Sequence, residues 1–200
     1  VILELGGDGA VIVHEGADLR RAAARCAFGA YAYAGQVCIS VQRILVHAPV
    51  YQEFRALFLA EVQKIRWGDP TDPHTLSGPV IDAVAGDRIM GLLAEAQGGG
   101  ASIALGGQRQ GNLIAPTVVE DVPAACALAE EEAFGPVAML ARYADIEEAI
   151  TEVNRSRYGL QAGVFTDSHA VVQKAVSGLD VGGILINEVP TSRPETAFCT

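Results

Sequence analysis

Residues 1–35, VILELGGDGAVIVHEGADLRRAAARCAFGAYAYAG, contain the pattern that sets the fold class. Residues 1–4 and 10–14 are apolar, β-branched runs of strand length, and the glycine-rich turn 6–9 separates them. Asp18 is a favourable N-cap for an alanine-rich helix that we expect to run to about Ala34 and to end at Gly35. The stretch therefore predicts strands followed by a helix.

The same alternation continues to the end of the chain. Pro49 lies at the expected start of an amphipathic helix, and Asp145 is the expected N-cap of another. The proline-rich run 68–74 is expected to form a loop. Strands are expected at residues 42–47, 102–105, 115–119, 137–143, 162–166 and 183–187, and further helices at 81–97 and 168–176. Continuous apolar strands that alternate with helices predict an α/β fold of three layers, with a largely parallel sheet covered by helices on both faces.

Composition narrows the class of protein. Two hundred residues are enough for one ordinary domain with a real core. No apolar run approaches the roughly 18 residues of a membrane helix, and no secretory signal is visible at the N-terminus, so we expect no membrane partner. The formal net charge of −10 argues against nucleic acid as a partner.

The cysteines and histidines give no metal-binding pattern. The 4 cysteines lie far apart without a C-x-x-C pair, which favours reduced thiols and a cytoplasmic location. The histidines stand apart from one another in the sequence, so we expect surface or strand-end residues and no metal site: His14, His47, His74 and His169.

Cys38 and Glu4 are the candidate catalytic pair. Cys38 lies in the run YAGQVCIS at 33–40, and Glu4, 34 residues upstream, directly precedes Leu5-Gly6-Gly7. A thiol nucleophile and a carboxylate base are the groups needed to form and then hydrolyse a thioester. Each also has an ordinary structural interpretation: a cysteine among alanines is commonly a small core residue, and Glu4 could be a surface carboxylate at a strand end.

Together these segments resemble the aldehyde dehydrogenase superfamily, in particular its C-terminal catalytic domain. Further blocks similar to that family follow in the expected order, so the resemblance covers nearly the whole chain: Glu132-Ala133-Phe134-Gly135-Pro136-Val137, the run YGLQAGVFT at 158–166, Ile186-Asn187, Pro116-Thr117-Val118 and Gly68-Asp69-Pro70.

The resemblance implies oxidation of an aldehyde to a carboxylic acid with NAD or NADP. Cys38 would form the thioester, its backbone N–H would face the oxyanion, and Glu4 would activate the hydrolytic water. Glu132 would bind the nicotinamide ribose, Phe134 would pack near the nicotinamide, and Asn187 would orient substrate or the nucleophile loop. Simpler interpretations stay open. In these, residues 130–132 are a solvent-exposed run of charges, Phe134 is a core residue, and Asn187 is a strand-end amide that only satisfies backbone groups.

The resemblance also implies a truncated domain. The chain begins without Met and departs from the family pattern after Arg193, and no G-x-G-x-x-G motif is found, so we expect an absent nicotinamide-binding domain and no cofactor bound to residues 1–200 alone. A full-length protein would be a homo-oligomer that acts on a small-molecule aldehyde. The alternative is a non-catalytic structural or interaction domain as the chain stands.

One residue departs from the family near the candidate base. Asp8 stands where the family commonly has Lys, and an anion there is expected to raise the pKa of Glu4.

Overall fold

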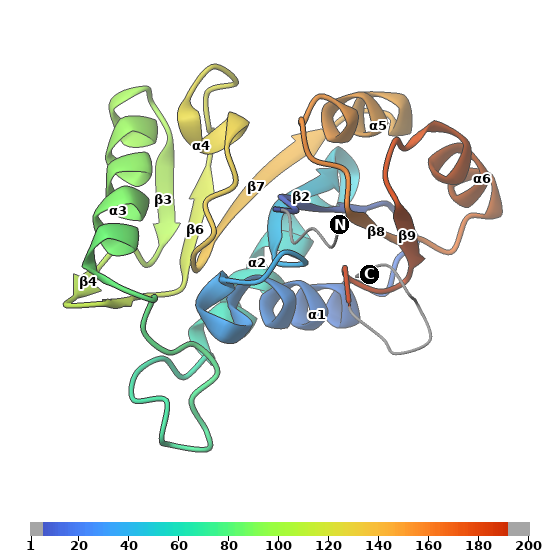
Figure 1. Ribbon diagram of the computed structural model, residues 1–200. Coiled ribbons are helices and arrows are strands. Elements are labelled where there is room, and N and C mark those ends of the chain that lie inside the picture. Colours follow the sequence, from blue (N-terminus) through green and yellow to red (C-terminus); the bar gives the residue numbers. More distant parts are fainter. Residues whose placement is uncertain (1–5, 192–200) are drawn as a thin grey trace, which may run out of the picture.

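A computed structural model describes residues 6–191, and the fold within them is built on one large mixed sheet (Figure 1). The sheet has the strand order β3-β6-β7-β2-β1-β8-β9, and a two-stranded hairpin, β4-β5, lies apart from it. Every neighbouring pair of the large sheet is parallel except β3 and β6. The strands are β1 Gly9–Val13, β2 Val41–His47, β3 Ser102–Leu105, β4 Arg109–Gln110, β5 Leu113–Ile114, β6 Thr117–Glu120, β7 Val137–Tyr143, β8 Gln161–Phe165 and β9 Gly183–Ile186.

Helices cover both faces of this sheet. The helices are α1 Leu19–Tyr31, α2 Tyr51–Gln63, α3 Ala83–Gly98, α4 Ala127–Glu130, α5 Ile146–Asn154 and α6 His169–Gly178, with short 3₁₀ segments at Ala32–Gly35 and Ala48–Val50. Helices α1 and α2 pack on one face, and α3 to α6 pack on the other. The predicted three-layer fold with a largely parallel sheet is confirmed.

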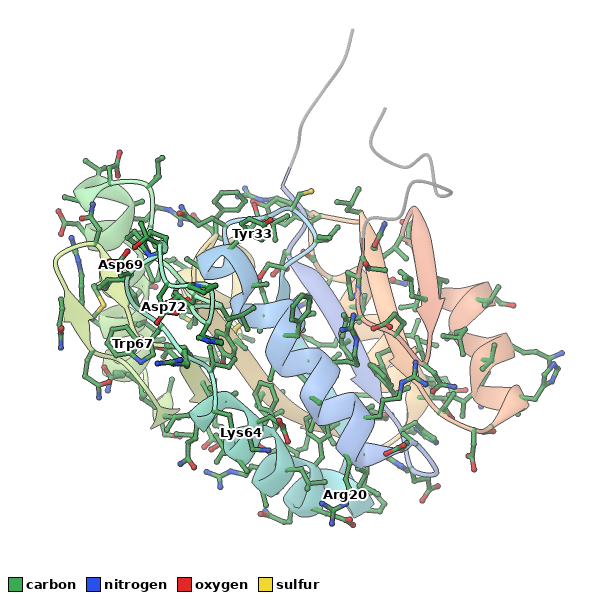
Figure 2. The ribbon with its side chains drawn as sticks, turned by 90° about the horizontal axis from the view of Figure 1, so that it is seen from below. Arg20, Tyr33, Lys64, Trp67, Asp69 and Asp72 are labelled. Carbon is green, nitrogen blue, oxygen red and sulfur yellow. The ribbon has the colours of Figure 1, made fainter. Side chains whose placement is uncertain are left out.

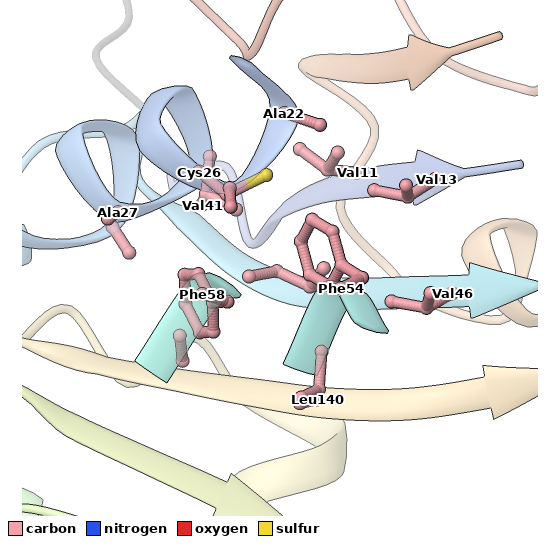
Figure 3. Close-up of a cluster of buried hydrophobic side chains, with 14 of the residues drawn as sticks. Val11, Val13, Ala22, Cys26, Ala27, Val41, Val46, Phe54, Phe58 and Leu140 are labelled. Atoms are coloured by element: carbon pink, nitrogen blue, oxygen red, sulfur yellow. The ribbon is translucent and has the colours of Figure 1, made fainter. Parts of the chain in front are cut away.

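Strand β1 shows why its sequence is apolar throughout. Val11 and Val13 point into the core beneath α1 and α2, where Phe54 is fully buried (Figure 3). Ala10 and Ile12 point to the opposite face and pack with residues of α5 and α6. A strand buried on both faces has no position for a polar side chain, so alternation is lost.

The helix starts follow the capping residues closely. Asp18, Asp145 and Ser168 each accept a hydrogen bond from a backbone N–H of the first turn, as expected of N-caps. Asp82 does the same for α3, so that helix begins at Ala83, two residues later than predicted.

Other boundaries differ from prediction. The first helix ends at Tyr31, not near Ala34, because Tyr33 and Ala34 adopt left-handed backbone angles. The helix expected from Pro49 begins at Tyr51, after a 3₁₀ turn that holds the proline. The hairpin β4-β5 and the short α4 were not predicted, since each is too short to show a periodicity. The strand expected at residues 1–4 lies outside the described residues.

The segment between α2 and α3 is a long loop, as its prolines predict. Asp69 and Asp72 form local turns by accepting hydrogen bonds from the backbone N–H groups of Thr71 and His74. An isolated bridge between Trp67 and Ser77 closes the loop. Figure 2 labels Trp67, Asp69 and Asp72 in this segment. No helix within residues 6–191 is both long enough and apolar enough to span a lipid bilayer.

His14 and His47 are strand-end residues, as expected, but they are not isolated from each other in the fold. His14 and His47 lie at the ends of the neighbouring strands β1 and β2, and their rings stack with centroids 4.3 Å apart. Sequence spacing hides the pair, because the strands are joined through α1 and become neighbours only in the sheet.

Candidate active site

The candidate site lies at the edge of the sheet where β1, β2 and β7 begin. These three strands are neighbours and run parallel, so the segments that precede them meet at one edge: residues 6–8, 36–40 and 131–136. Each segment carries one of the family-like sequence blocks. The topology therefore gathers blocks that lie far apart in the sequence.

Cys38 sits in a tight turn immediately before β2. The turn is closed by the N–H of Ser40, which donates to the carbonyl of Val37 over 2.9 Å. Cys38 is half-buried. Upstream of it, Tyr33, Ala34 and Gly35 all have positive φ angles, of 54°, 56° and 66°. Two of these are not glycine, and such strain persists only where the surroundings enforce it, often at functional sites.

Gly35 explains how this strained segment is held. A Cβ atom at Gly35 would overlap the carbonyl oxygen of Gly135, so the segment before Cys38 packs directly on the loop before β7. Gln36 adds a second tie, because its Oε1 accepts a hydrogen bond from the N–H of Ile81 over 2.9 Å. The Cys38 turn is thus fixed against two other parts of the chain.

The loop 6–8 passes between Cys38 and Glu132. A Cβ atom at Gly7 would overlap the carbonyl oxygen of Cys38, and one at Gly6 would overlap the carboxylate of Glu132. Only glycine allows the backbone to approach both neighbours this closely. Glu4 lies outside the described residues, but this loop, which follows it in sequence, lies against the Cys38 turn.

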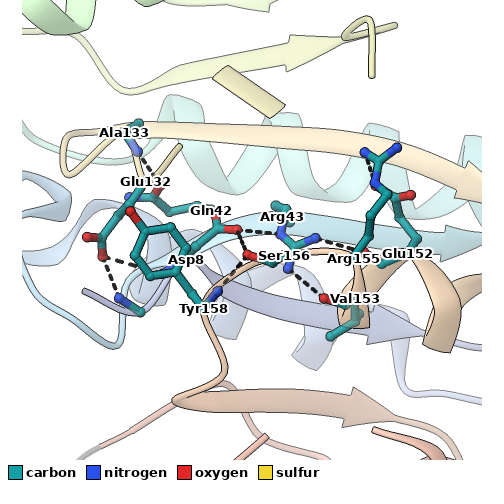
Figure 4. Close-up of polar contacts among 11 residues, drawn as sticks. Asp8, Gln42, Arg43, Glu132, Ala133, Glu152, Val153, Arg155, Ser156 and Tyr158 are labelled. Carbon is teal, nitrogen blue, oxygen red and sulfur yellow. Dashed lines mark hydrogen bonds and ion pairs between the residues drawn. The ribbon is translucent and has the colours of Figure 1, made fainter. Parts of the chain in front are cut away.

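Glu132 is set apart from its two acidic neighbours by burial. Glu130 and Glu131 are exposed, whereas Glu132 has only 9% of its surface exposed. Its Oε1 accepts hydrogen bonds from the backbone N–H groups of Gly7, at 2.8 Å, and Asp8, at 3.4 Å (Figure 4). The reading of this run as a solvated face therefore does not hold for Glu132.

Two residues that the sequence analysis missed hold the Glu132 loop in place. Arg88 donates to the carbonyl oxygens of Glu132 and Ala133, over 2.6 Å and 2.8 Å. Gln42, buried in β2, accepts from the N–H of Ala133 over 2.7 Å. A buried glutamine inside an apolar strand was the one sequence signal for such a role, since buried amides need partners.

A cavity of about 350 Å³ opens beside this loop. Phe134 on its rim has a positive φ of 46° and is 37% exposed, so it is not a core residue. Cys38 is not among the lining residues, which are Gln36, Ile81, Ala85, Arg88, Ile89, Glu132, Phe134 and Tyr158.

Asp8 is buried and paired. Its Oδ2 lies 2.9 Å from Nε of Arg43 and accepts a hydrogen bond from the Ser156 hydroxyl over 2.9 Å. Burial raises the pKa of Asp8 above its ordinary value, and the Arg43 cation opposes that rise. Asp8 thus has Arg43 as its counter-ion, while Glu4, whose pKa Asp8 is expected to raise, lies outside the described residues.

Asn187 lies at the opposite edge of the sheet from Cys38. It follows the end of β9, has a positive φ of 56°, and accepts a hydrogen bond from the N–H of Thr166 over 3.0 Å. The structure does not bring it together with Cys38 and Glu132. This placement favours the reading of Asn187 as a strand-end amide that satisfies a backbone group.

Comparisons with known proteins agree on one family. The sequence matches the aldehyde dehydrogenase family over residues 1–199. It is 40% identical to a sulfoacetaldehyde dehydrogenase of Neptuniibacter caesariensis over 195 residues, which is 98% of this chain and 43% of that protein. It is also 40% identical to a vanillin dehydrogenase of Pseudomonas fluorescens over 182 residues, 89% of this chain and 38% of that one.

Solved structures show the same relationship in three dimensions. An NADP-dependent glyceraldehyde-3-phosphate dehydrogenase from Bacillus halodurans, complexed with NADP, superposes with a TM-score of 0.91 at 38% identity. An aldehyde dehydrogenase from Physcomitrella patens, in complex with the reaction product succinate, superposes with a TM-score of 0.92, also at 38% identity. Each match covers 96% of this chain and 40% of the other. The chain thus spans about two fifths of the length of the proteins it resembles.

Proposed function

This chain belongs to the aldehyde dehydrogenase family, and on that premise we propose that it supplies the catalytic thiol, Cys38, of an NAD(P)-dependent aldehyde dehydrogenase. The observation that carries the proposal is the packing of the Gly6–Gly7 loop between the Cys38 turn and the Glu132 carboxylate. That packing places the candidate nucleophile, the loop after the candidate base and the candidate ribose ligand at one edge of the sheet.

The chemistry follows from the residue types. The Cys38 thiolate attacks the aldehyde carbon, a C–S bond forms, and the carbonyl oxygen becomes an oxyanion that the backbone N–H of Cys38 can stabilise. A bound nicotinamide would supply the hydride acceptor for this tetrahedral carbon. Glu4 then takes a proton from the water that attacks the Cys38 thioester, and the thiolate is released with the carboxylic acid.

The residues present fit the nicotinamide-ribose end of a dinucleotide. The Glu132 carboxylate is held rigidly by two backbone N–H groups, and a carboxylate has lone pairs left for ribose hydroxyls. The adjoining cavity of about 350 Å³ lies at the small end of the range of roughly 300–1,000 Å³ that is usual for ligand sites. We therefore assign Glu132 and Phe134 to the reactive end of the cofactor only.

The substrate is proposed no further than an aldehyde. Two relatives are named for a sulfonated aldehyde and for vanillin, which differ in charge and size. The complexes with NADP concern other proteins, so NAD and NADP both remain within the proposal.

The alternative is that residues 1–200 act as a non-catalytic structural or interaction domain. The two functions are separated by NADH or NADPH formation from a panel of aldehydes, measured with the complete gene product and with residues 1–200 alone. If the chain is catalytic, the complete gene product should turn over, and Cys38→Ala should abolish this turnover. Cys126→Ala is the matched control, because it changes a cysteine in the core beneath α3, and it should keep the activity. Turnover by Cys38→Ala at the wild-type rate would refute the proposal.

A further inference from the structure

A second cluster of reactive side chains lies at the carboxyl end of the sheet, away from Cys38. His14 directly follows β1, His47 ends β2, and Tyr143, the register partner of His47, ends β7. Ligands of open α/β sheets commonly bind at this edge. The proposed aldehyde chemistry uses the opposite edge and leaves these residues without a role.

Glu15 completes the cluster. The stacked rings of His14 and His47 are inclined by only 6°, and Oε1 of Glu15 lies 3.9 Å from Nδ1 of His47. One ring nitrogen from each histidine and a carboxylate oxygen of Glu15 all lie within 4.8 Å of one another. The backbone turn at 14–17, closed by the N–H of Ala17 on the carbonyl of His14, holds Glu15 beside the rings.

His47 presents a buried nitrogen without a hydrogen-bond partner. Its Nε2 lies 3.1 Å from the carbonyl oxygen of Ala144 and must donate to it, so Nδ1 of the neutral ring carries the lone pair. Nδ1 is buried and makes no hydrogen bond, and only 9% of the His47 surface is exposed. The carboxylate of Glu15 cannot satisfy this lone pair, because both atoms are acceptors.

His14 is held in a similar way. Its Nδ1 lies 2.7 Å from the Tyr143 hydroxyl, which lies 3.4 Å from the carbonyl oxygen of Val13. Because the Tyr143 hydroxyl donates to the carbonyl of Val13, it accepts a hydrogen bond from the Nδ1–H group of His14. In this tautomer of His14, the lone pair is on Nε2. Such outer partners, a carbonyl and a hydroxyl, are what orient metal-binding imidazoles.

The carboxylate of Glu15 adds a negative charge beside the two rings, and this charge favours a cation over a neutral or anionic ligand.

We propose that His14, Glu15 and His47 form a binding site for a divalent transition-metal ion, with Zn²⁺ the best match. Two imidazoles and one carboxylate suit zinc, whereas Mg²⁺ and Ca²⁺ prefer oxygen ligands throughout. Zn–N bonds of roughly 2.0–2.1 Å require the ligand atoms to draw closer than they stand now. Glu15 can make that movement, because 58% of its side chain is exposed. The two rings must also rotate, because a metal bond lies in the plane of each imidazole and these planes are stacked at only 6° to one another. Because Glu15 is exposed, water can reach the ion and fill its remaining coordination positions.

Calorimetric titration of the chain with ZnCl₂ tests the site. Glu15→Gln removes an exposed ligand without disturbing the core, and we expect affinity to fall by at least about 10-fold; His47→Asn should reduce it by more than about 100-fold, since even outer-partner changes cost 10–100-fold. His74→Asn and His169→Asn change exposed histidines elsewhere and should bind zinc as the wild type does.

Thermal unfolding supplies a second measurement. Zinc should raise the Tm of the wild type and of both control variants, and should raise that of Glu15→Gln much less, because only the native state contains the site. The unfolding temperature of each variant without zinc shows whether it is folded. The proposal is overturned if Glu15→Gln and His47→Asn bind zinc like the wild type, or if Cys38→Ala alone abolishes binding, which would assign the metal to the thiol.

Discussion

Gly7→Ala is the substitution that most sharply tests how the candidate site is assembled. The added methyl would coincide with the carbonyl oxygen of Cys38, a backbone atom that cannot rotate away. Neither side can shift freely: the N–H of Gly7 is bonded to Glu132 over 2.8 Å, and the Cys38 turn is closed by its bond from Ser40 to Val37. Overpacking of this kind costs about 1–3 kcal/mol. In a chain of 200 residues, a loss of about 2 kcal/mol lowers Tm by roughly 4–8 °C.

Gly91→Ala is the matched control. Gly91 is exposed in the middle of α3, and no atom beyond its own stretch of helix lies within 4 Å of the position its Cβ would take, so alanine should stabilise the chain by about 0.5–1 kcal/mol. Urea denaturation followed by circular dichroism gives the free energy of unfolding of both variants. The rate of Cys38 alkylation by iodoacetamide, followed by mass spectrometry, should change several-fold in Gly7→Ala and stay constant in Gly91→Ala. A Gly7→Ala variant with wild-type stability and an unchanged Cys38 rate would refute the packing of this loop on the thiol turn.

Three further predictions need simpler experiments. Cys38 should react with iodoacetamide much faster than Cys26, because complete burial raises the pKa of the Cys26 thiol far above its ordinary value; equal labelling in the native state would count against Cys38. Glu120→Gln should lower the free energy of unfolding at pH 7 by about 1 kcal/mol, since the hydrogen bond from Arg55 lowers the pKa of Glu120. That contribution is present above the unfolded pKa of roughly 4.3 and is lost as pH falls through the lower folded value, so the stabilities of wild type and variant should converge as the pH of the urea titrations is lowered; a difference that does not shrink with falling pH would contradict it. Residues 1–200 alone should show no NAD binding by calorimetry, because the described residues fit only the nicotinamide-ribose end, and micromolar binding would show an unrecognised phosphate site.

The sequence predicted the bounds of two strands and the positions of two helix caps. Strand β7, Val137–Tyr143, and strand β3, Ser102–Leu105, match their predicted bounds, and the Asp18 and Asp145 caps lie where predicted. The end of α1 was misplaced, since alanine propensity favours continuing the helix, and tertiary contact of Gly35 with Gly135 imposes the left-handed turn instead.

The candidate site was predictable only in part. The sequence blocks identified Cys38 and Glu132, but no local pattern shows that Arg88 and Gln42 hold the Glu132 loop, because those bonds join segments 44 and 91 residues apart. The stacking of His14 on His47 was equally hidden, since it depends on which strands become neighbours.

The most direct test of the central claim is to trap the acyl group on Cys38. In the complete gene product, Glu4→Gln should allow thioester formation but slow its hydrolysis, because Glu4 is assigned to the water that attacks afterwards. After mixing with NAD(P)⁺ and an aldehyde substrate and quenching in acid, mass spectrometry should find the acyl mass on the tryptic peptide 26–43, with fragment ions placing it on Cys38 and not on Cys26. A burst of about one equivalent of reduced cofactor per site should accompany it. Reduced cofactor formed with no acyl mass on Cys38, or with the acyl group on Cys26, would contradict the account.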